Sequence, residues 1–260
     1  MNDKLEELFH LRRKDAEEQE RRFSYRDILR TLGDVPPPVD FGAPFKRRDS
    51  ATRIIAEIKK ADPFNGVVRG DFHAIELGEE LSDAGASALS IAVEPRSYLG
   101  SEDNFRRIRS VSALPLLYKD CISSRYQIAE ARMSGADAIE LVASVLNDAD
   151  LVALKAHAHE LGMSVVCITG SDKEIERVVN LDFKIVGIVC RDPQTGAFDA
   201  RKFAGLVQLL PRSNVKIAMG GIESREDAAS AKAAGADAIL AGAALMRAPR
   251  PALKLRELRM

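Results

Sequence analysis

The sequence has no tryptophan, three cysteines and few aromatic residues. Cys121, Cys167 and Cys190 fit none of the spacings of metal-binding cysteines, so we expect no metal site, and such thiols suit a reducing compartment. The chain contains no run of about 18 apolar residues, which argues against a spanning helix. Residues 1–20 are too densely charged for a secretory signal. We therefore expect a cytoplasmic protein.

An excess of charge of one sign is also lacking, since 38 basic residues face 39 acidic ones and the formal net charge is −1. A chain balanced in this way gives no indication of a nucleic-acid or membrane partner. We expect neither partner, no cofactor, and a monomer or weak homo-oligomer.

At 260 residues the chain has the length of a single α/β barrel. From Ile54 onward, short apolar runs typical of buried strands alternate with helical segments, which is the pattern of a parallel α/β fold. The eight predicted strands cover residues 54–58, 88–92, 114–118, 138–142, 164–168, 185–189, 215–218 and 238–241. Predicted helices between them include residues 74–83, 125–134, 148–160, 201–210 and 225–234.

Before the first predicted strand, the sequence predicts a helical extension. Residues 5–22 combine a narrow apolar stripe with dense alternating charge, so we expect a solvated helix on the domain surface. A short helix over residues 25–32 and a proline-rich connector over residues 34–40 follow. We expect residues 1–48 to pack on a barrel formed by residues 49–260.

A six-residue pattern recurs three times, as AGASAL from Ala84, SGADAI from Ser134 and AGADAI from Ala234. Its glycine suits the left-handed cap that ends a helix, and its small residues allow a tight turn into the next strand. The spacings of 50 and 100 residues equal two and four βα units, so the pattern predicts a (β/α)8 TIM barrel with extra N-terminal helices. A doubly wound open sheet is the alternative, but residues 59–64 lack the glycine-rich fingerprint that usually follows its first strand.

The first predicted strand carries two charged residues. Glu57 and Lys59 are two positions apart, so on a strand both side chains point to the same face. Active sites of such barrels form at the C-terminal ends of the strands. The two residues therefore either pair structurally or line the mouth of a site.

Glycines follow the last two predicted strands. Gly220 and Gly221 after the seventh strand, and Gly242 and Ala243 after the eighth, offer backbone N–H groups beside a short helix. That arrangement is the usual phosphate cradle of the fold. Glycines that only permit tight turns are the alternative, but the two sites together favour phosphate.

Several stretches resemble one known family. They are IIAEIKKADPFNGVVRGDF, LPLLYKDCISSRYQIAEARMSGADAIEL, HELGMSVV, VGIVCRDPQTGAFD and AGADAILAGAALMR, with the N-terminal helices and PPPVDF. Over nearly its whole length the chain is similar to indole-3-glycerol phosphate synthase. That tryptophan-pathway barrel closes a carboxyphenylamino-deoxyribulose phosphate into an indole, with loss of carbon dioxide and water. The resemblance implies a lyase and decarboxylase with a phosphorylated substrate.

The resemblance also implies roles for individual residues. The family's first-strand Glu and Lys correspond to Glu57 and Lys59, and its third-strand general-acid Lys corresponds to Lys119. On the ligand-binding side the matches are an aromatic at Tyr98, a loop residue at Arg191, glycines at Gly221 and Gly242, and replaced serines at Asp62 and Ala243.

Other polar positions of the family are lost. Its fifth-strand catalytic Glu falls at Ile168, its sixth-strand Asn at Val189, and a Glu-Ser pair at Met219 and Gly220. Ile168 and Met219 cannot transfer protons, and Val189 cannot donate a hydrogen bond. Since positioned acid–base groups contribute roughly 10²–10⁴-fold each, we expect most of the family's rate to be lost.

Two carboxylates stand where the family has none. Glu140 lies mid-strand at an apolar position of the family, and if it points inward it neighbours Lys119. The functional interpretation is a relocated acid–base pair, and the alternative is a carboxylate that neutralises the lysines of a decayed site. Asp62 adds a negative charge near Lys59 that would repel the carboxylate of the family's substrate.

Three hypotheses follow. The chain is a diverged enzyme that binds a phosphorylated small molecule and uses Lys119 with Glu140 or Glu57 for weak or altered lyase chemistry. Alternatively it is a genuine indole-3-glycerol phosphate synthase with an altered proton relay, or a barrel that only binds. The charges kept at Glu57, Lys59 and Lys119 argue against the last, because unused buried charges are costly.

Overall fold

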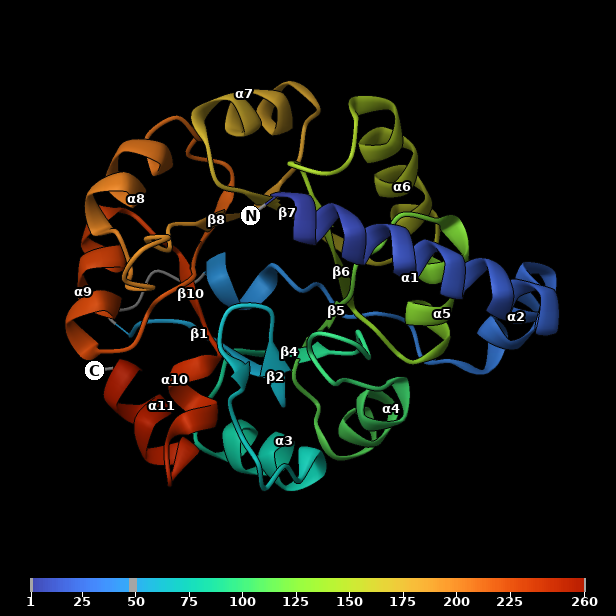
Figure 1. Ribbon diagram of the computed structural model, residues 1–260, viewed down its shortest axis with the longest axis horizontal. Helices are drawn as coiled ribbons and strands as arrows, with labels where there is room; N and C mark the ends of the chain where they lie inside the picture. The colour runs from blue at the N-terminus through green and yellow to red at the C-terminus, as the bar shows by residue number, and fades with distance from the viewer. Residues whose placement is uncertain (1, 47–50, 260) are drawn as a thin grey trace.

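The computed structural model describes residues 2–46 and 51–259, which form a closed barrel of eight parallel strands inside a ring of helices (Figure 1). The barrel strands are β1 (Ile54–Ile58), β4 (Ala88–Ala92), β5 (Leu116–Lys119), β6 (Ala138–Val142), β7 (Ser164–Thr169), β8 (Ile185–Val189), β9 (Val215–Met219) and β10 (Ala238–Ala241). They pair in chain order, and β10 closes the ring against β1. A small hairpin, β2 (Ala61–Asp62) with β3 (Gly66–Val67), follows β1. The predicted (β/α)8 barrel is confirmed.

Helices precede the barrel and follow its strands. They are α1 (Asn2–Arg22), α2 (Tyr25–Thr31), α3 (Ala74–Asp83), α4 (Glu102–Val111), α5 (Arg125–Met133), α6 (Asp148–Glu160), α7 (Asp172–Asn180), α8 (Ala200–Val207), α9 (Arg225–Ala234), α10 (Ala243–Arg247) and α11 (Pro251–Arg259), with 3₁₀ turns η1 (Leu32–Asp34) and η2 (Ala43–Lys46). In the described part of the chain, none of these helices has the length and apolarity needed to cross a membrane.

The repeated glycine pattern marks three helix-to-strand turns. Gly85, Gly135 and Gly235 have φ angles of 95°, 88° and 112°, which residues other than glycine rarely adopt. They lead into β4, β6 and β10, the second, fourth and eighth barrel strands. The predicted placement of these strands is confirmed.

The third barrel strand differs most from its prediction over residues 114–118. Pro115 has no backbone N–H for the ladder, so β5 begins one residue later. At the other end, Lys119 remains in the sheet in register with Ala92. This register fixes Lys119 as a residue of the strand itself.

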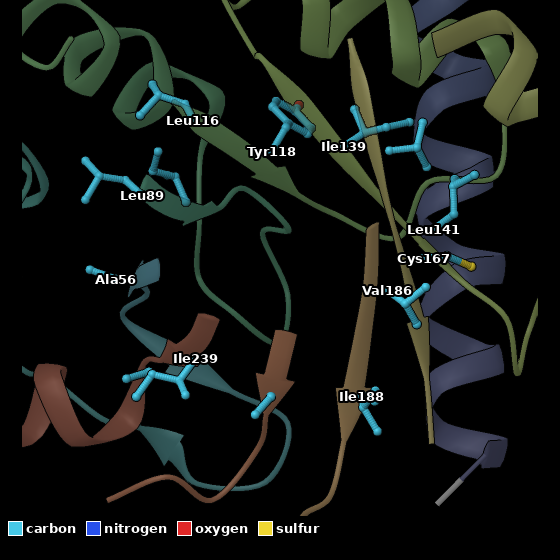
Figure 2. Packing of buried hydrophobic residues seen from close by; sticks show 14 of the residues in the cluster. Ala56, Leu89, Leu116, Tyr118, Ile139, Leu141, Cys167, Val186, Ile188 and Ile239 are labelled. Atoms are coloured by element: carbon cyan, nitrogen blue, oxygen red, sulfur yellow. The ribbon is translucent and has the colours of Figure 1, made fainter. Parts of the chain in front are cut away.

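Alternate side chains of each strand face the helices or the barrel interior. Figure 2 shows residues of the outer layer, including Leu116, Tyr118, Ile139 and Leu141. The inner cluster contains Phe41, Phe45, Ile55, Ala88, Leu117, Ala138, Val166, Ile168, Ile185, Val215, Ile217, Met219, Ala238 and Leu240. The same alternation turns Glu57, Lys119 and Glu140 inward, because each follows an inner residue by two positions.

Helix α1 crosses one end of the barrel, from near β7 towards α2 (Figure 1). Leu8 and Phe9 are buried in the outer core. Arg12 is buried as well, and its Nε donates to Oδ1 of Asp120, directly after β5, at 2.9 Å. The prediction of a merely solvated helix is therefore wrong on this face, because a buried ion pair anchors α1. The boundary predicted at residues 48 and 49 lies outside the described residues.

A buried acidic cluster lies between α1, α4, α5 and β5. The carboxyl groups of Glu102, Asp120 and Glu130 interact with Arg12, and Tyr118 Oη donates to Glu102 at 3.3 Å. Glu130 is 5% exposed, and one of its oxygens has no partner among the described residues. Burial, with the nearby charge of Glu102, raises the pKa of Glu130 to about 8.

This pKa predicts a pH-dependent stability. Glu130 holds its proton more tightly in the folded chain, so its contribution is full below about pH 4.5 and is lost as the pH rises through about 8. We expect the free energy of unfolding to fall by about 3 kcal/mol between pH 6 and 9 through this group. Urea titrations should show that Glu130→Gln removes most of this fall. Glu17→Gln, at an exposed position of α1, is the control. Identical pH profiles for wild type and Glu130→Gln would contradict the assignment.

Candidate active site

Four charged side chains form a connected series of ion pairs, the ion-paired chain, at the C-terminal ends of β1, β5 and β6. Its members are Lys59, Glu57, Lys119 and Glu140. Lys119 Nζ lies 3.1 Å from both carboxylate oxygens of Glu140 and 3.6 Å from Oε2 of Glu57. The other oxygen of Glu57 pairs with Lys59 Nζ. The side chains of both lysines are 11% exposed, so these ion pairs are largely buried but not sealed from solvent. The structure thus brings Glu140 to Lys119, as the sequence predicts.

The pairing decides how these groups hold protons. Burial alone would lower the pKa of Lys119, but the Glu140 carboxylate and its neighbours hold it well above its usual range. Burial works to raise the pKa of Glu57, yet the charges of Lys59 and Lys119 outweigh it and the pKa is lowered. For Glu140 burial prevails over the attraction of Lys119, and the pKa is raised. Glu140 therefore takes up a proton more readily than Glu57.

The β2–β3 hairpin holds Asp62 against Lys59. The Asp62 carboxylate accepts hydrogen bonds from the backbone N–H groups of Phe64 at 2.9 Å and Asn65 at 2.8 Å, and from the Asn65 side chain. Its Oδ2 also lies 3.0 Å from Lys59 Nζ. Burial works against the charge, but Lys59 and Asn65 lower the pKa of Asp62 to about 2. Lys59 is thus neutralised from two sides, by Glu57 and by Asp62.

Tyr98 covers Lys119 from the loop after β4, with its ring centre 5.5 Å from Nζ. Glu94 shapes this loop, because its fully buried carboxylate accepts hydrogen bonds from the backbone N–H groups of residues 96–98. The carbonyl of Tyr98 in turn accepts from the N–H of Ala61 in β2 at 3.1 Å. The loops after β1 and β4 are therefore joined over the ion-paired chain.

Gly220 and Gly221 follow β9 with φ angles of 85° and 80°. A Cβ at Gly221 would lie 2.5 Å from backbone atoms of Ala197 and Phe198. Only glycine allows the loop after β8 to approach so closely. Tight packing therefore accounts for Gly221 in part, and its role in a phosphate cradle stays a prediction.

Gly242 lies between β10 and α10 and touches the ion-paired chain. A Cβ at this position would lie 2.5 Å from Oε1 of Glu57 and 3.0 Å from Nζ of Lys59. A side chain here would displace that pair. The N–H groups of Ala243 and Ala244, in the first turn of α10, have no partner within the helix.

Arg191 connects the β2–β3 hairpin to the loops on the glycine side. Its guanidinium lies 4.9 Å from the ring centre of Phe64 and donates to Oδ1 of Asn65 at 3.3 Å. The Cβ of Arg191 lies 3.2 Å from the position that a Cβ at Gly220 would occupy. The Cβ and backbone N of Arg191 therefore pack beside Gly220, while its guanidinium is held at the hairpin.

The strands opposite the lysines present an apolar wall. Ile168 and Met219 are buried in the inner cluster, and partly buried Val142 and Val189 pack against it. These four side chains come from β6, β7, β8 and β9, which are neighbours in the barrel. The three positions where the family carries polar residues thus hold hydrocarbon and thioether groups that face the interior.

Sequence reasoning missed Glu94 and Ser90. Ser90 faces the interior in register with Glu57, is fully buried, and its hydroxyl has no partner among the described residues. Its place on a predicted strand was the available signal. Cys121 is buried, and burial raises the pKa of its thiol, which suits an inert group. Within residues 2–46 and 51–259, no group of three or more His, Cys, Asp and Glu side chains is placed to hold a metal ion.

Comparison with known sequences gives matches over the whole barrel. The profile of the family described as indole-3-glycerol phosphate synthase matches residues 5–258. The indole-3-glycerol phosphate synthase of Koribacter versatilis (strain Ellin345) is 37% identical over 214 residues, which cover 82% of each chain. That of Dehalococcoides mccartyi (strain CBDB1) is 35% identical, covering 94% of this chain and 95% of the relative. That of Acidithiobacillus ferrooxidans (strain ATCC 53993 / BNL-5-31) is 32% identical over 99% of both.

Solved structures share the barrel at much lower identity. Thiamine phosphate pyrophosphorylase from Pyrococcus furiosus superposes with a TM-score of 0.60 at 15% identity, covering 80% of this chain and 93% of that chain. N-acetylmannosamine-6-phosphate 2-epimerase from Clostridium perfringens also gives 0.60, at 17% identity, covering 75% and 88%. These two likenesses show the fold alone. The family profile and the relatives, in contrast, match the sequence itself almost from end to end, so the chain belongs to the indole-3-glycerol phosphate synthase family.

Proposed function

We propose that the chain is a diverged enzyme of this family, which binds a phosphorylated small molecule such as an aryl-amino sugar phosphate and moves protons through Lys119 and Glu140. One observation carries the proposal: Lys119 Nζ contacts both oxygens of Glu140 at 3.1 Å. At the position of Glu140 the family has an apolar residue. A carboxylate introduced beside the general-acid lysine changes what that lysine can do.

The two groups divide the work between charge and proton. Lys119 presents an ammonium to a ligand oxygen, where it stabilises developing negative charge. Glu140 has a raised pKa and is in hydrogen-bond contact with Lys119, so it supplies or accepts the proton. Glu57 bridges Lys119 and Lys59 and holds both ammonium groups in place.

The phosphate is proposed to bind at the backbone N–H groups that follow β9 and β10. Gly220, Gly221 and the first turn of α10 contribute the N–H groups. Lys59 Nζ, beside Gly242, is already paired with Glu57 and Asp62, so the backbone N–H groups carry the proposed contact with the phosphate. This is the side of the mouth that the resemblance assigns to phosphate.

The family's own ring closure is proposed to be weak or lost. It requires a general acid for the carbonyl oxygen and a second group that relays protons during dehydration. Ile168 and Met219 stand where the family has carboxylates, and neither can transfer a proton. Val189 cannot hold a substrate hydroxyl by a hydrogen bond.

A second candidate is genuine indole-3-glycerol phosphate synthase activity with Glu140 in place of the lost relay. The names of the relatives at 32% to 37% identity favour it. Both candidates use the same lysine, so the rate with the family's substrate separates them.

The first test supplies carboxyphenylamino-deoxyribulose phosphate and follows indole fluorescence. We expect kcat/KM to be lower by about 10⁴-fold or more than that of the Koribacter enzyme assayed in parallel, since several proton-handling groups are missing. Glu140→Gln and Lys119→Met should each reduce any residual turnover. A rate comparable to that of the relative would establish the second candidate instead.

The phosphate position is tested separately by calorimetry with glycerol 3-phosphate. Ala243→Asp places a negative charge at the first turn of α10, and we expect it to weaken binding by about tenfold or more. The matched control is Ala248→Asp at the other end of the same helix, which should bind like wild type. Equal weakening by both variants, or by neither, would move the phosphate away from α10.

A further inference from the structure

We infer that the ligand of this site is a phosphate monoester whose opposite end is an apolar aryl or alkyl group without a carboxylate. The inference rests on the proposed phosphate-binding function and names the class of compound. The family's substrate carries a ring carboxylate that is lost as carbon dioxide. A ligand without that group has no such step.

The first argument is the charge of the ion-paired chain. Lys59 lies between Glu57 and Asp62, and Lys119 lies between Glu140 and Glu57. Three carboxyl groups thus face two ammonium groups. Even when Glu140 is protonated, the two remaining carboxylates cancel both lysines. This side of the mouth therefore has no surplus positive charge for a ligand carboxylate.

Asp62 makes the cancellation permanent at neutral pH. Its pKa is lowered to about 2, and four hydrogen bonds from Phe64 and Asn65 fix its orientation. A ligand carboxylate that needed Lys59 as its counter-ion would meet Asp62 at the same ammonium. The repulsion acts in a partly buried place, where charges are poorly screened.

Arg191 does not supply the missing positive charge. Its Cβ and backbone N lie beside Gly220, whereas its guanidinium donates to Asn65. Its positive charge is therefore engaged at the β2–β3 hairpin and is not offered to a ligand carboxylate.

The second argument is the wall opposite the lysines. Ile168, Met219, Val142 and Val189 offer apolar surface and no hydrogen-bond donor from their side chains. A carboxylate against this wall would lose its hydration without a replacement partner. An aryl or alkyl group gains from the same contact, because its apolar surface leaves water.

The experiment compares two compounds that differ in one group. Calorimetry with phenylamino-deoxyribulose phosphate and with carboxyphenylamino-deoxyribulose phosphate keeps the sugar, phosphate and ring the same. We expect the compound without the carboxylate to bind at least about tenfold tighter. Asp62→Asn, which keeps the shape of the side chain, should tighten binding of the carboxylated compound and narrow the difference. Thermal melts establish that this variant is folded, and the wild-type comparison stands without it.

Glycerol 3-phosphate is the third probe, and it separates this inference from the function on which it rests. Equal or tighter binding of the carboxylated compound overturns the inference and leaves the phosphate site intact. Binding of glycerol 3-phosphate but of neither aryl compound also overturns it, since no apolar site then exists. If none of the three probes binds, the proposed phosphate-binding function fails and the inference fails with it.

Discussion

Charge inside a barrel must be paired, and here one carboxylate pairs with two lysines. Glu57 lies between Lys59 and Lys119, so removing it would leave two buried ammonium groups with fewer partners. Its neighbours are fixed around it: Gly242 has no side chain because the Glu57–Lys59 pair occupies that space, and the hairpin brings Asp62 to the far side of Lys59. The geometry of the whole mouth depends on this bridging contact.

Patterns of short range were enough to predict the barrel. Strand alternation placed Glu57 and Lys59 on one face, and the same period of two turned Glu140 towards Lys119. The repeated glycine pattern gave the count of βα units, because a left-handed cap requires glycine at each of those turns. The third strand was misplaced by two residues at its start, since Pro115 satisfies apolar patterning but cannot donate to the ladder.

The partners of individual polar side chains could not be predicted in this way, whether they lie near or far in the sequence. Glu94 binds the backbone of its own loop, and nothing in its spacing distinguishes it from a solvated glutamate. Arg12 pairs with Asp120 across 108 positions, so the sequence predicted a surface helix where the structure has an anchored one. Roles inferred from the resemblance could be placed on residues, but their partners, such as Asn65 for Asp62, came only with the three-dimensional arrangement.

The sequence identity to the relatives is compatible with different acidic residues at the mouth of the barrel, because the two depend on different positions. Fold is maintained by the alternation of many apolar positions, whereas proton transfer depends on a few side chains at the strand ends. Measured against the family pattern, carboxylates are absent at Ile168 and Met219 and present at Asp62 and Glu140. The number of acids at the mouth is unchanged, but they have moved from the wall facing the lysines to direct contact with them. Asp62 and Glu140 thus pair with the protein's own lysines at the strand ends, and the many apolar positions that maintain the fold do not depend on where these few acids lie.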